Sequence, residues 1–214
     1  MPEQLLKGVR VIDFTDFLAG PYIGMYFADM GADVIKFENL RSGGNFVRNA
    51  RPHEKQSGLS MYFQNLNRNK RGVALDLKKE ESKKLFTELI RSADVLIENF
   101  RPGAMDKLGL GPAALAEVNP RLVYASCKGF LPGPYEHRAA LDEVVQMMGG
   151  LAYMTGPPGQ PLRAGSSVND IMGGLFAVIG IMAARRERER TGRGGLVQSG
   201  LFETNMVLVA QHMA

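Results

Sequence analysis

The chain has 214 residues, of which 45% are apolar and 22% charged, and its formal net charge is +4. This composition excludes a disordered chain, which would combine low hydrophobicity with high net charge. The length suits one well-buried domain, or a domain and part of another. The mild positive charge suits a small anionic ligand. It does not indicate nucleic acid, because the dense basic run at 185–193 alternates arginine with glutamate.

The cysteine and histidine content bears on compartment and metal binding. A single cysteine, Cys127, allows no internal disulfide and gives no support for an oxidising compartment. The N-terminal residues lack a long apolar signal core, and no stretch is expected to cross a membrane. We therefore expect a cytoplasmic protein without a membrane or nucleic-acid partner. The three histidines share no spacing with acidic residues or cysteine that would indicate a metal site.

Short β-like runs alternate with helical segments along the chain. Strands are expected at 9–15, 33–38, 71–77, 95–100 and 122–130, with helices at 19–32, 78–93 and 112–118. Apolar helices at 142–154 and 170–190, a strand at 196–201 and a helix at 202–213 follow. Two irregular stretches remain, at 40–58 and 155–169, and long loops in compact domains are often functional. The alternation predicts an α/β fold with a parallel sheet and right-handed crossovers.

The turn after the first strand resembles a dinucleotide-binding turn in position only. Glu38, at the end of the second strand, stands where such proteins hold a ribose. The G-x-G-x-x-G fingerprint is absent, however, since the turn offers only Gly20 followed by Pro21. We therefore do not predict a nicotinamide or flavin enzyme, although the turn could approach a different nucleotide closely.

Asp170 opens the long apolar helix predicted at 170–190. An aspartate at this position commonly serves as an N-cap, because its oxygen accepts an unpaired backbone N–H. The same position suits a functional carboxylate, since the helix dipole stabilises negative charge and the flanking serines and glycines leave room for a ligand. Carboxylates also act as covalent nucleophiles. The residue pattern alone favours the cap and leaves the nucleophile open.

Polar residues lie at the ends of two further predicted strands. Asn99 and Lys107 lie at and beyond the end of the strand at 95–100, and Lys128 lies near the end of the next. Ligands bind at the carboxyl ends of parallel strands in open α/β sheets, although an ordinary connection or an exposed lysine would give the same pattern. Cys127, in an apolar strand, is expected to be a buried and inert thiol.

Six segments, taken together and in order, resemble CoA-transferase family III, which contains formyl-CoA and carnitine CoA-transferases and α-methylacyl-CoA racemase. They are LKGVRVIDFTDFLAGP, GADVIKFE, NRNKRGVALDL, ENFRPGAMDKLG, NPRLVYASCKGF and VNDIMGG with AARRERERTGRGG. The resemblance covers essentially the whole chain. It implies that residues 1–214 form the N-terminal part of a large Rossmann-like CoA-binding domain, with the small domain and the C-terminal return absent. It also implies acyl-CoA and organic-acid substrates, no metal, and an interlocked homodimer.

The resemblance implies roles for individual residues. Asp170 falls at the position of the catalytic nucleophile, and Arg71 falls where it could add charge near the ligand. The implied CoA-binding residues are Leu18, Ala19, Leu75, Lys78, Asn99, Phe100, Lys107 and Lys128. The implied reaction moves coenzyme A from an acyl-CoA donor to an organic-acid carboxylate through an aspartyl-CoA thioester. Backbone N–H groups at the helix start are expected to stabilise the developing oxyanion.

Three positions depart from the patterns of particular family members. Leu18 and Phe130 stand where formyl-CoA:oxalate transferase has glutamine and tyrosine, and both differences count against oxalate-type recognition. Leu141 replaces the histidine that racemases carry just before the residue aligned with Asp142. Racemisation needs an acid and a base on opposite faces of the α-carbon, so a transferase is favoured. The alternatives are a racemase of the same family and a non-catalytic CoA-binding subunit.

Overall fold

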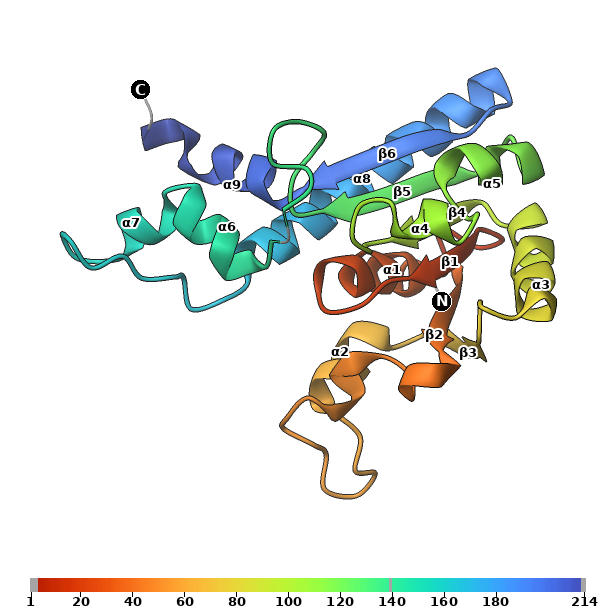
Figure 1. Cartoon of the computed structure of the whole chain (residues 1–214), viewed down its shortest axis with the longest axis horizontal. Coiled ribbons are helices and arrows are strands. Elements are labelled where there is room, and N and C mark those ends of the chain that lie inside the picture. Colours follow the sequence, from red (N-terminus) through yellow and green to blue (C-terminus); the bar gives the residue numbers. More distant parts are fainter. Residues whose placement is uncertain (1–3, 139, 213–214) are drawn as a thin grey trace.

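The computed structural model describes residues 4–138 and 140–212 and contains one six-stranded parallel sheet (Figure 1). Its order is β3-β2-β1-β4-β5-β6. This is the order of doubly wound Rossmann sheets, in which strand addition changes direction between β1 and β4. The predicted α/β fold is therefore confirmed. The strands are β1 (Arg10–Phe14), β2 (Asp33–Asn39), β3 (Arg71–Leu75), β4 (Val95–Glu98), β5 (Val123–Lys128) and β6 (Gly195–Gly200).

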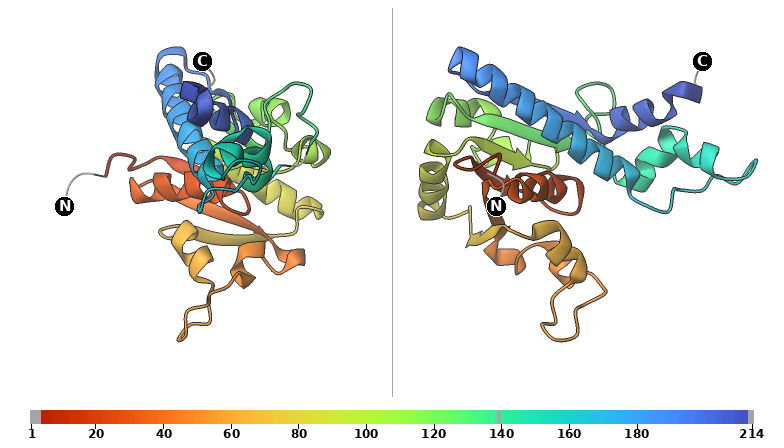
Figure 2. Two further views of the ribbon diagram at one scale, coloured as in Figure 1. Left: turned by 90° about the vertical axis from the view of Figure 1, so that its left-hand side faces the viewer. Right: turned by 180° about the vertical axis from the view of Figure 1, so that it is seen from behind.

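Helices cover both faces of the sheet, so strand residues alternate between two cores. Val11 packs in the core that contains residues of α1 and α8, whereas Ile12 packs in the core that contains residues of α3, α4 and α5. Figure 2 shows α8 running along one face of the sheet beside α1. These helices are α1 (Ala19–Asp29), α3 (Glu80–Arg91), α4 (Ala104–Lys107), α5 (Pro112–Val118) and α8 (Val168–Thr191).

Several helices differ from the sequence-based expectation. The helix predicted at 142–154 is two helices, α6 (Asp142–Met148) and α7 (Leu151–Thr155), because Gly150 between them has a φ of 87° that breaks the helix. The segment between β2 and β3, predicted to begin as a loop, holds η1 (Leu40–Ser42), η2 (Phe46–Asn49) and α2 (Met61–Asn67). The chain ends in α9 (Leu201–Val209) and η3 (Ala210–His212).

The longest helix, α8, is apolar over its first turns. By length and composition it could cross a membrane, contrary to the expectation from sequence, but it packs along α1, β5, β6 and α9. Its start, with α6, α7 and α9, extends beyond the sheet as an arm in Figures 1 and 2.

Candidate active site

Asp170 lies in the first turn of α8 but does not cap it. Ser167 precedes the helix and makes no side-chain cap bond. The carboxylate of Asp142, at the start of α6, instead accepts hydrogen bonds from the N–H groups of Asn169 at 2.8 Å and Asp170 at 3.3 Å. The N-cap interpretation of Asp170 is therefore wrong, because a buried carboxylate from another helix occupies that place.

This arrangement changes the ionisation of Asp170. Burial, together with the negative charges of Asp142 and Glu143, raises the pKa of Asp170 to about 7, against a lowering effect of Arg163. We had expected the helix dipole to stabilise the Asp170 carboxylate, but Asp142 takes that position. The N–H groups of residues 169 and 170 already donate to Asp142, so they are not the free oxyanion donors that the sequence predicted.

Asp142 is itself held by two polar side chains. The side-chain amide of Gln146 donates to Asp142 Oδ2, and Arg163 Nη2 lies 3.4 Å from the same oxygen. Gln146 Oε1 also accepts from the N–H of Ala164 at 2.7 Å. These bonds join α6 to the irregular stretch before α8, so the position of Asp170 depends on residues from both segments.

Asp170 opens onto a cavity of about 540 Å³ at the carboxyl ends of the strands. Five of the residues implied by sequence line it together: Ala19, Asn99, Phe100, Lys128 and Asp170. These residues come from α1, from the chain just after β4, from β5 and from α8, so only the folded sheet with its helices brings them together. The other lining side chains include three that the sequence did not indicate: Arg101, Glu136 and Arg138.

Two more cavities adjoin this one. Phe100 is shared with a cavity of about 220 Å³ that also contains Leu75 and Lys78, as the sequence implied. Its walls are largely apolar, from Phe14, Phe37 and Leu77 among others. Lys128 is shared with a third cavity, of about 450 Å³, lined by Tyr124, Ser126 and Gln198. Phe100 therefore borders the first and second cavities, and Lys128 borders the first and third, as do Arg101 and Glu136.

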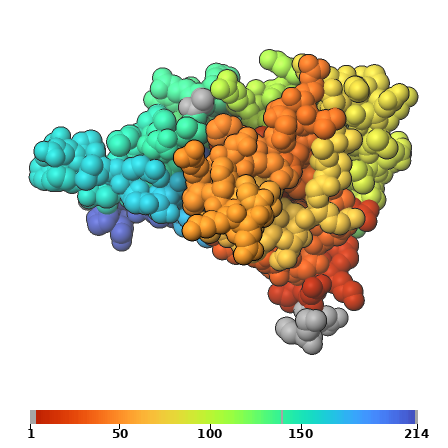
Figure 3. Space-filling view, turned by 90° about the horizontal axis from the view of Figure 1, so that it is seen from below, coloured from red at the N-terminus to blue at the C-terminus, as the bar shows by residue number. Residues whose placement is uncertain are grey.

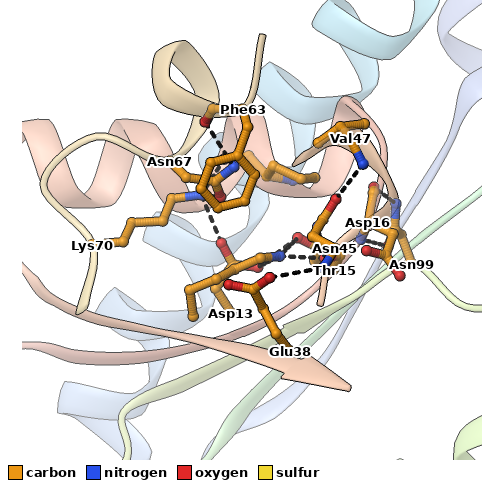
Figure 4. Close-up of polar contacts among 12 residues, drawn as sticks. Asp13, Thr15, Asp16, Glu38, Asn45, Val47, Phe63, Asn67, Lys70 and Asn99 are labelled. Carbon is orange, nitrogen blue, oxygen red and sulfur yellow. Dashed lines mark hydrogen bonds and ion pairs between the residues drawn. The ribbon is translucent and has the colours of Figure 1, made fainter. Parts of the chain in front are cut away.

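Lys128 and Asn99 are both engaged by the protein itself. Lys128 Nζ lies 2.7 Å from the buried carboxylate of Glu98 and donates to the carbonyl of Phe100. Asn99 accepts from the N–H of Asp16 at 2.8 Å and donates to the carbonyl of Asp16 at 2.7 Å (Figure 4). Asn99 thus holds the β1–α1 turn in shape from the neighbouring strand.

Three implied residues lie outside these cavities. Leu18 is the residue before α1, and Lys107 is exposed on α4; neither belongs to the lining of the three cavities. Arg71 pairs with Asp33 at 2.6 Å, at the amino end of β2 and β3. The expectation that Arg71 adds charge to the site is wrong, because the cavities lie at the opposite edge of the sheet.

Neither the Glu38 carboxylate nor the Cys127 thiol is available as a ligand-binding or reactive group in this arrangement. Arg48 Nε donates to the Glu38 carboxylate at 2.7 Å, and the N–H of Asn45 donates to it at the same distance. Glu38 therefore binds the segment after β2 and does not stand free for a ribose. Burial raises the pKa of the Cys127 thiol to about 12, which agrees with the expected inert thiol. Within residues 4–138 and 140–212 no group of three His, Cys, Asp or Glu side chains could hold a metal ion.

Sequence reasoning missed several residues near the site. Arg41, in the segment after β2, lines the second cavity, and Arg101 and Arg138 line the first. All three follow carboxyl ends of parallel strands, a signal that could have found them. Tyr62 on α2 gave no such signal in the sequence. Burial, and secondly the charge of Asp170, raise the pKa of Tyr62 to about 12.

Comparisons with known proteins agree with the fold. The sequence model of CoA-transferase family III matches residues 6–214. Acetyl-CoA:oxalate CoA-transferase from Acetobacter aceti is 42% identical over 214 residues, which cover 99% of this chain and 54% of the relative. Formyl-CoA:oxalate CoA-transferase from Streptomyces coelicolor is 43% identical over 195 residues, covering 91% of this chain and 47% of the relative.

Solved structures give the same result. A CAIB/BAIF family protein from Brucella suis superimposes with a TM-score of 0.91 at 38% identity, covering 97% of this chain and 56% of that protein. A hypothetical protein from Mycobacterium tuberculosis gives a TM-score of 0.90 at 37% identity, covering 100% of this chain and 59% of that protein. The chain spans about half the length of the curated relatives that it matches.

Proposed function

This chain belongs to CoA-transferase family III, and we propose that it carries the nucleophile and the CoA-binding surface of a transferase that moves coenzyme A from an acyl-CoA to an organic acid. The observation that carries the proposal is the cavity shared by Asp170 and four residues implied as CoA contacts. A half-buried carboxylate facing a cavity of this size, at the carboxyl ends of the strands, suits attack on a bound thioester.

The three cavities suggest how the ligand lies. The second cavity, with aromatic walls and the cations Arg41 and Lys78, suits an adenine ring and its phosphates. The pantetheine arm would then pass Phe100, which borders both cavities, and bring the thioester to Asp170. Arg101 and Arg138 line the Asp170 cavity and supply positive charge that would attract an acceptor carboxylate.

The chemistry proceeds in balanced steps. A carboxylate oxygen of Asp170 attacks the thioester carbonyl, and the C–S bond breaks to give a mixed anhydride and CoA thiolate. The thiolate attacks Cγ of Asp170, which releases the donor acid as its carboxylate and leaves an aspartyl-CoA thioester. The acceptor carboxylate then attacks Cγ and releases the thiolate, which attacks the acceptor's carbonyl. The new acyl-CoA leaves, and the Asp170 carboxylate is restored.

A mass-spectrometric experiment tests this role. The chain is incubated with acetyl-CoA, digested and examined for a CoA adduct on the peptide that contains Asp170. We expect the adduct in the wild type and in Glu117→Gln, which changes an exposed carboxylate on α5, and no adduct in Asp170→Asn. An adduct that persists in Asp170→Asn would show that another residue is the nucleophile.

The alternatives give different outcomes in the same assay. CoA binding without any adduct would favour a non-catalytic CoA-binding subunit. Deuterium exchange at the α-carbon of a 2-methylacyl-CoA, without transfer, would favour a racemase. Oxalate appears in the names of the relatives, and it is tested as acceptor beside longer acids. Release of the adduct by longer acids but not by oxalate would agree with the departures at Leu18 and Phe130.

We also propose that the arm joins a second copy of the chain. Its surface carries large exposed apolar side chains, among them Met147, Tyr153 and Val207, and Ile179 of α8 is 63% exposed. Several large exposed apolar side chains on one projecting segment are consistent with an interface. Light scattering should find a dimer, and Val207→Asp on α9 should lower its stability; a monomer at all concentrations would contradict the proposal.

A further inference from the structure

Three buried charged side chains lie behind the β1–α1 turn, outside the lining of the three cavities. Asp13 on β1, Lys36 on β2 and Lys70 before β3 have side chains at most 2% exposed. Lys36 Nζ lies 3.2 Å from Asp13 Oδ1, and Lys70 Nζ lies 2.7 Å from Asp13 Oδ2 (Figure 4). Two ammonium groups share one carboxylate, so this charge cluster carries a surplus positive charge.

Each ammonium group also donates to a backbone carbonyl at one end of the β1–α1 connection. Lys36 donates to the carbonyl of Thr15, and Lys70 donates to the carbonyl of Pro21 at 2.8 Å. These two carbonyls bracket the stretch that contains Phe17 and Ala19, both of which line the Asp170 cavity. Because Phe17 has a φ of 62°, which is uncommon outside glycine, the turn depends on such external bonds for its shape.

Helix α1 packs directly on the charge cluster. Gly20 and Gly24 are four residues apart and lie on the same face of α1. A Cβ atom at Gly24 would lie 3.1 Å from Lys70 Nζ and nearer still to Asp13, and one at Gly20 would lie 3.0 Å from Asn99 Cγ. The backbone of α1 therefore sits on these side chains with nothing between, so their positions set the position of the helix start.

Lys70 also ties the turn to the segment 40–69. Its third bond goes to Asn67 Oδ1 at 3.0 Å, and Asn67 in turn donates to the carbonyl of Phe63 in α2 (Figure 4). The ring of Phe46, in the same segment, lies 5.7 Å from that of Phe17. Figure 3 shows this segment, in orange, spread over one face of the molecule. Lys70 thus bonds the β1 carboxylate, the start of α1 and the end of α2 through one ammonium group.

We propose that Lys70 is a positioning residue for acyl-CoA binding, which fixes the β1–α1 turn against the segment 40–69 without touching the ligand. The proposal rests on the CoA-binding function proposed above. All three donors of the Lys70 ammonium are bonded within the protein, to Asp13, Pro21 and Asn67, so none is left for a phosphate. The effect on the ligand must therefore pass through the backbone of the turn.

Lys70→Met is the variant that tests this role. It removes the donors, nearly keeps the side-chain length, and leaves Asp13 and Lys36 as a one-to-one pair, so no buried carboxylate loses all its partners. Asp13→Asn would instead leave two buried ammonium groups without a counter-charge, and it is avoided for that reason. The matched control is Lys55→Met, which changes an exposed lysine of the same segment.

Two measurements separate positioning from simple packing and from direct contact. Hydrogen exchange of the peptides covering 15–24, measured without ligand, should become faster in Lys70→Met and stay unchanged in Lys55→Met. CoA affinity, measured by calorimetry at several salt concentrations, should fall by about 10- to 100-fold, since small misplacements of a site cost about this much. Its salt dependence should stay as in the wild type, because no charge contact to a phosphate is lost.

Each of the other outcomes would contradict one part of the proposal. Unchanged exchange and affinity in a folded variant would leave Lys70 a packing role only, and a weaker salt dependence would make it a direct phosphate contact. If Lys70→Met does not fold, Asn67→Ala is used in its place, because it removes the bond between Lys70 and α2. Unchanged hydrogen exchange at 15–24 in that variant would overturn the proposal. A wild type that binds no CoA would overturn the function proposed above, whereas the exchange result judges the positioning of the turn separately.

Discussion

Replacing Asp142 by asparagine should lower the pKa of Asp170. The variant keeps an oxygen that can accept from the N–H groups of residues 169 and 170, but it removes the negative charge beside the nucleophile. The pKa of Asp170 stands at about 7 against an ordinary 3.8, a difference that corresponds to about 4 kcal/mol. Because burial is the largest cause and Asp142 the second, we expect Asp142→Asn to lower the value by about one unit, or about 1.4 kcal/mol.

The assay is the pH dependence of CoA-adduct formation between pH 5 and 9. The carboxylate is the nucleophile, so the rate in the wild type should rise with pH through about 7 and then level off. In Asp142→Asn the inflection should move to lower pH, and carbon NMR of the Asp170 carboxyl should titrate with it. An inflection that stays in place or rises in Asp142→Asn would refute the role of Asp142, and a wild-type inflection near 4 would refute the raised pKa itself.

Further predictions concern stability and binding. Because the pKa of Asp170 is raised on folding, its ionisation costs stability as pH rises from 3.8 to about 7. Asp170→Asn removes this cost, so it should raise the free energy of unfolding by about 2 to 4 kcal/mol at pH 8 and by about half of that at pH 5. Urea titrations at the two pH values measure the difference. Lys107 lies outside the three cavities, and only the family resemblance implies that it contacts CoA; if that role holds, Lys107→Ala weakens CoA binding with little change in stability, since this side chain is exposed. Lys128→Ala should weaken binding and also cost about 1 to 3 kcal/mol of stability, because Glu98 is left buried without its cation. Equal stability of Lys128→Ala and Lys107→Ala would contradict the buried pair. Gly24→Ala should destabilise by about 1 to 3 kcal/mol through its clash with the charge cluster, while Gly72→Ala, whose added methyl meets open space, should not; calorimetric melting compares the two.

Much of the architecture follows from local patterns in the chain. The β-branched runs at 9–15 and 95–100 predicted buried strands, and the alternation of strands with helices predicted a parallel sheet. These predictions hold because strand and helix periodicity is a property of neighbouring residues. The six segments that resemble the family likewise identified residues that meet around one cavity. The break at Gly150 was missed, because a glycine inside an apolar run is compatible with a continuous helix as well as with a break, and only the folded backbone shows which occurs.

The state of the charged groups was decided only by tertiary contacts. The residue pattern at Asp170 favoured a helix cap and left a nucleophile open, and Glu38 matched a ribose-binding residue in position only; in the structure Asp142 caps α8 and Arg48 holds Glu38. Likewise, nothing in the sequence distinguished Lys36, within β2, or Lys70, just before β3, yet both are buried on one carboxylate behind the β1–α1 turn. The partners of these groups lie 10 to 57 residues away in the chain. The sequence by itself therefore determined the sheet and the candidate nucleophile, whereas burial and distant charges, which exist only in the folded chain, decided its pKa and the support of its site.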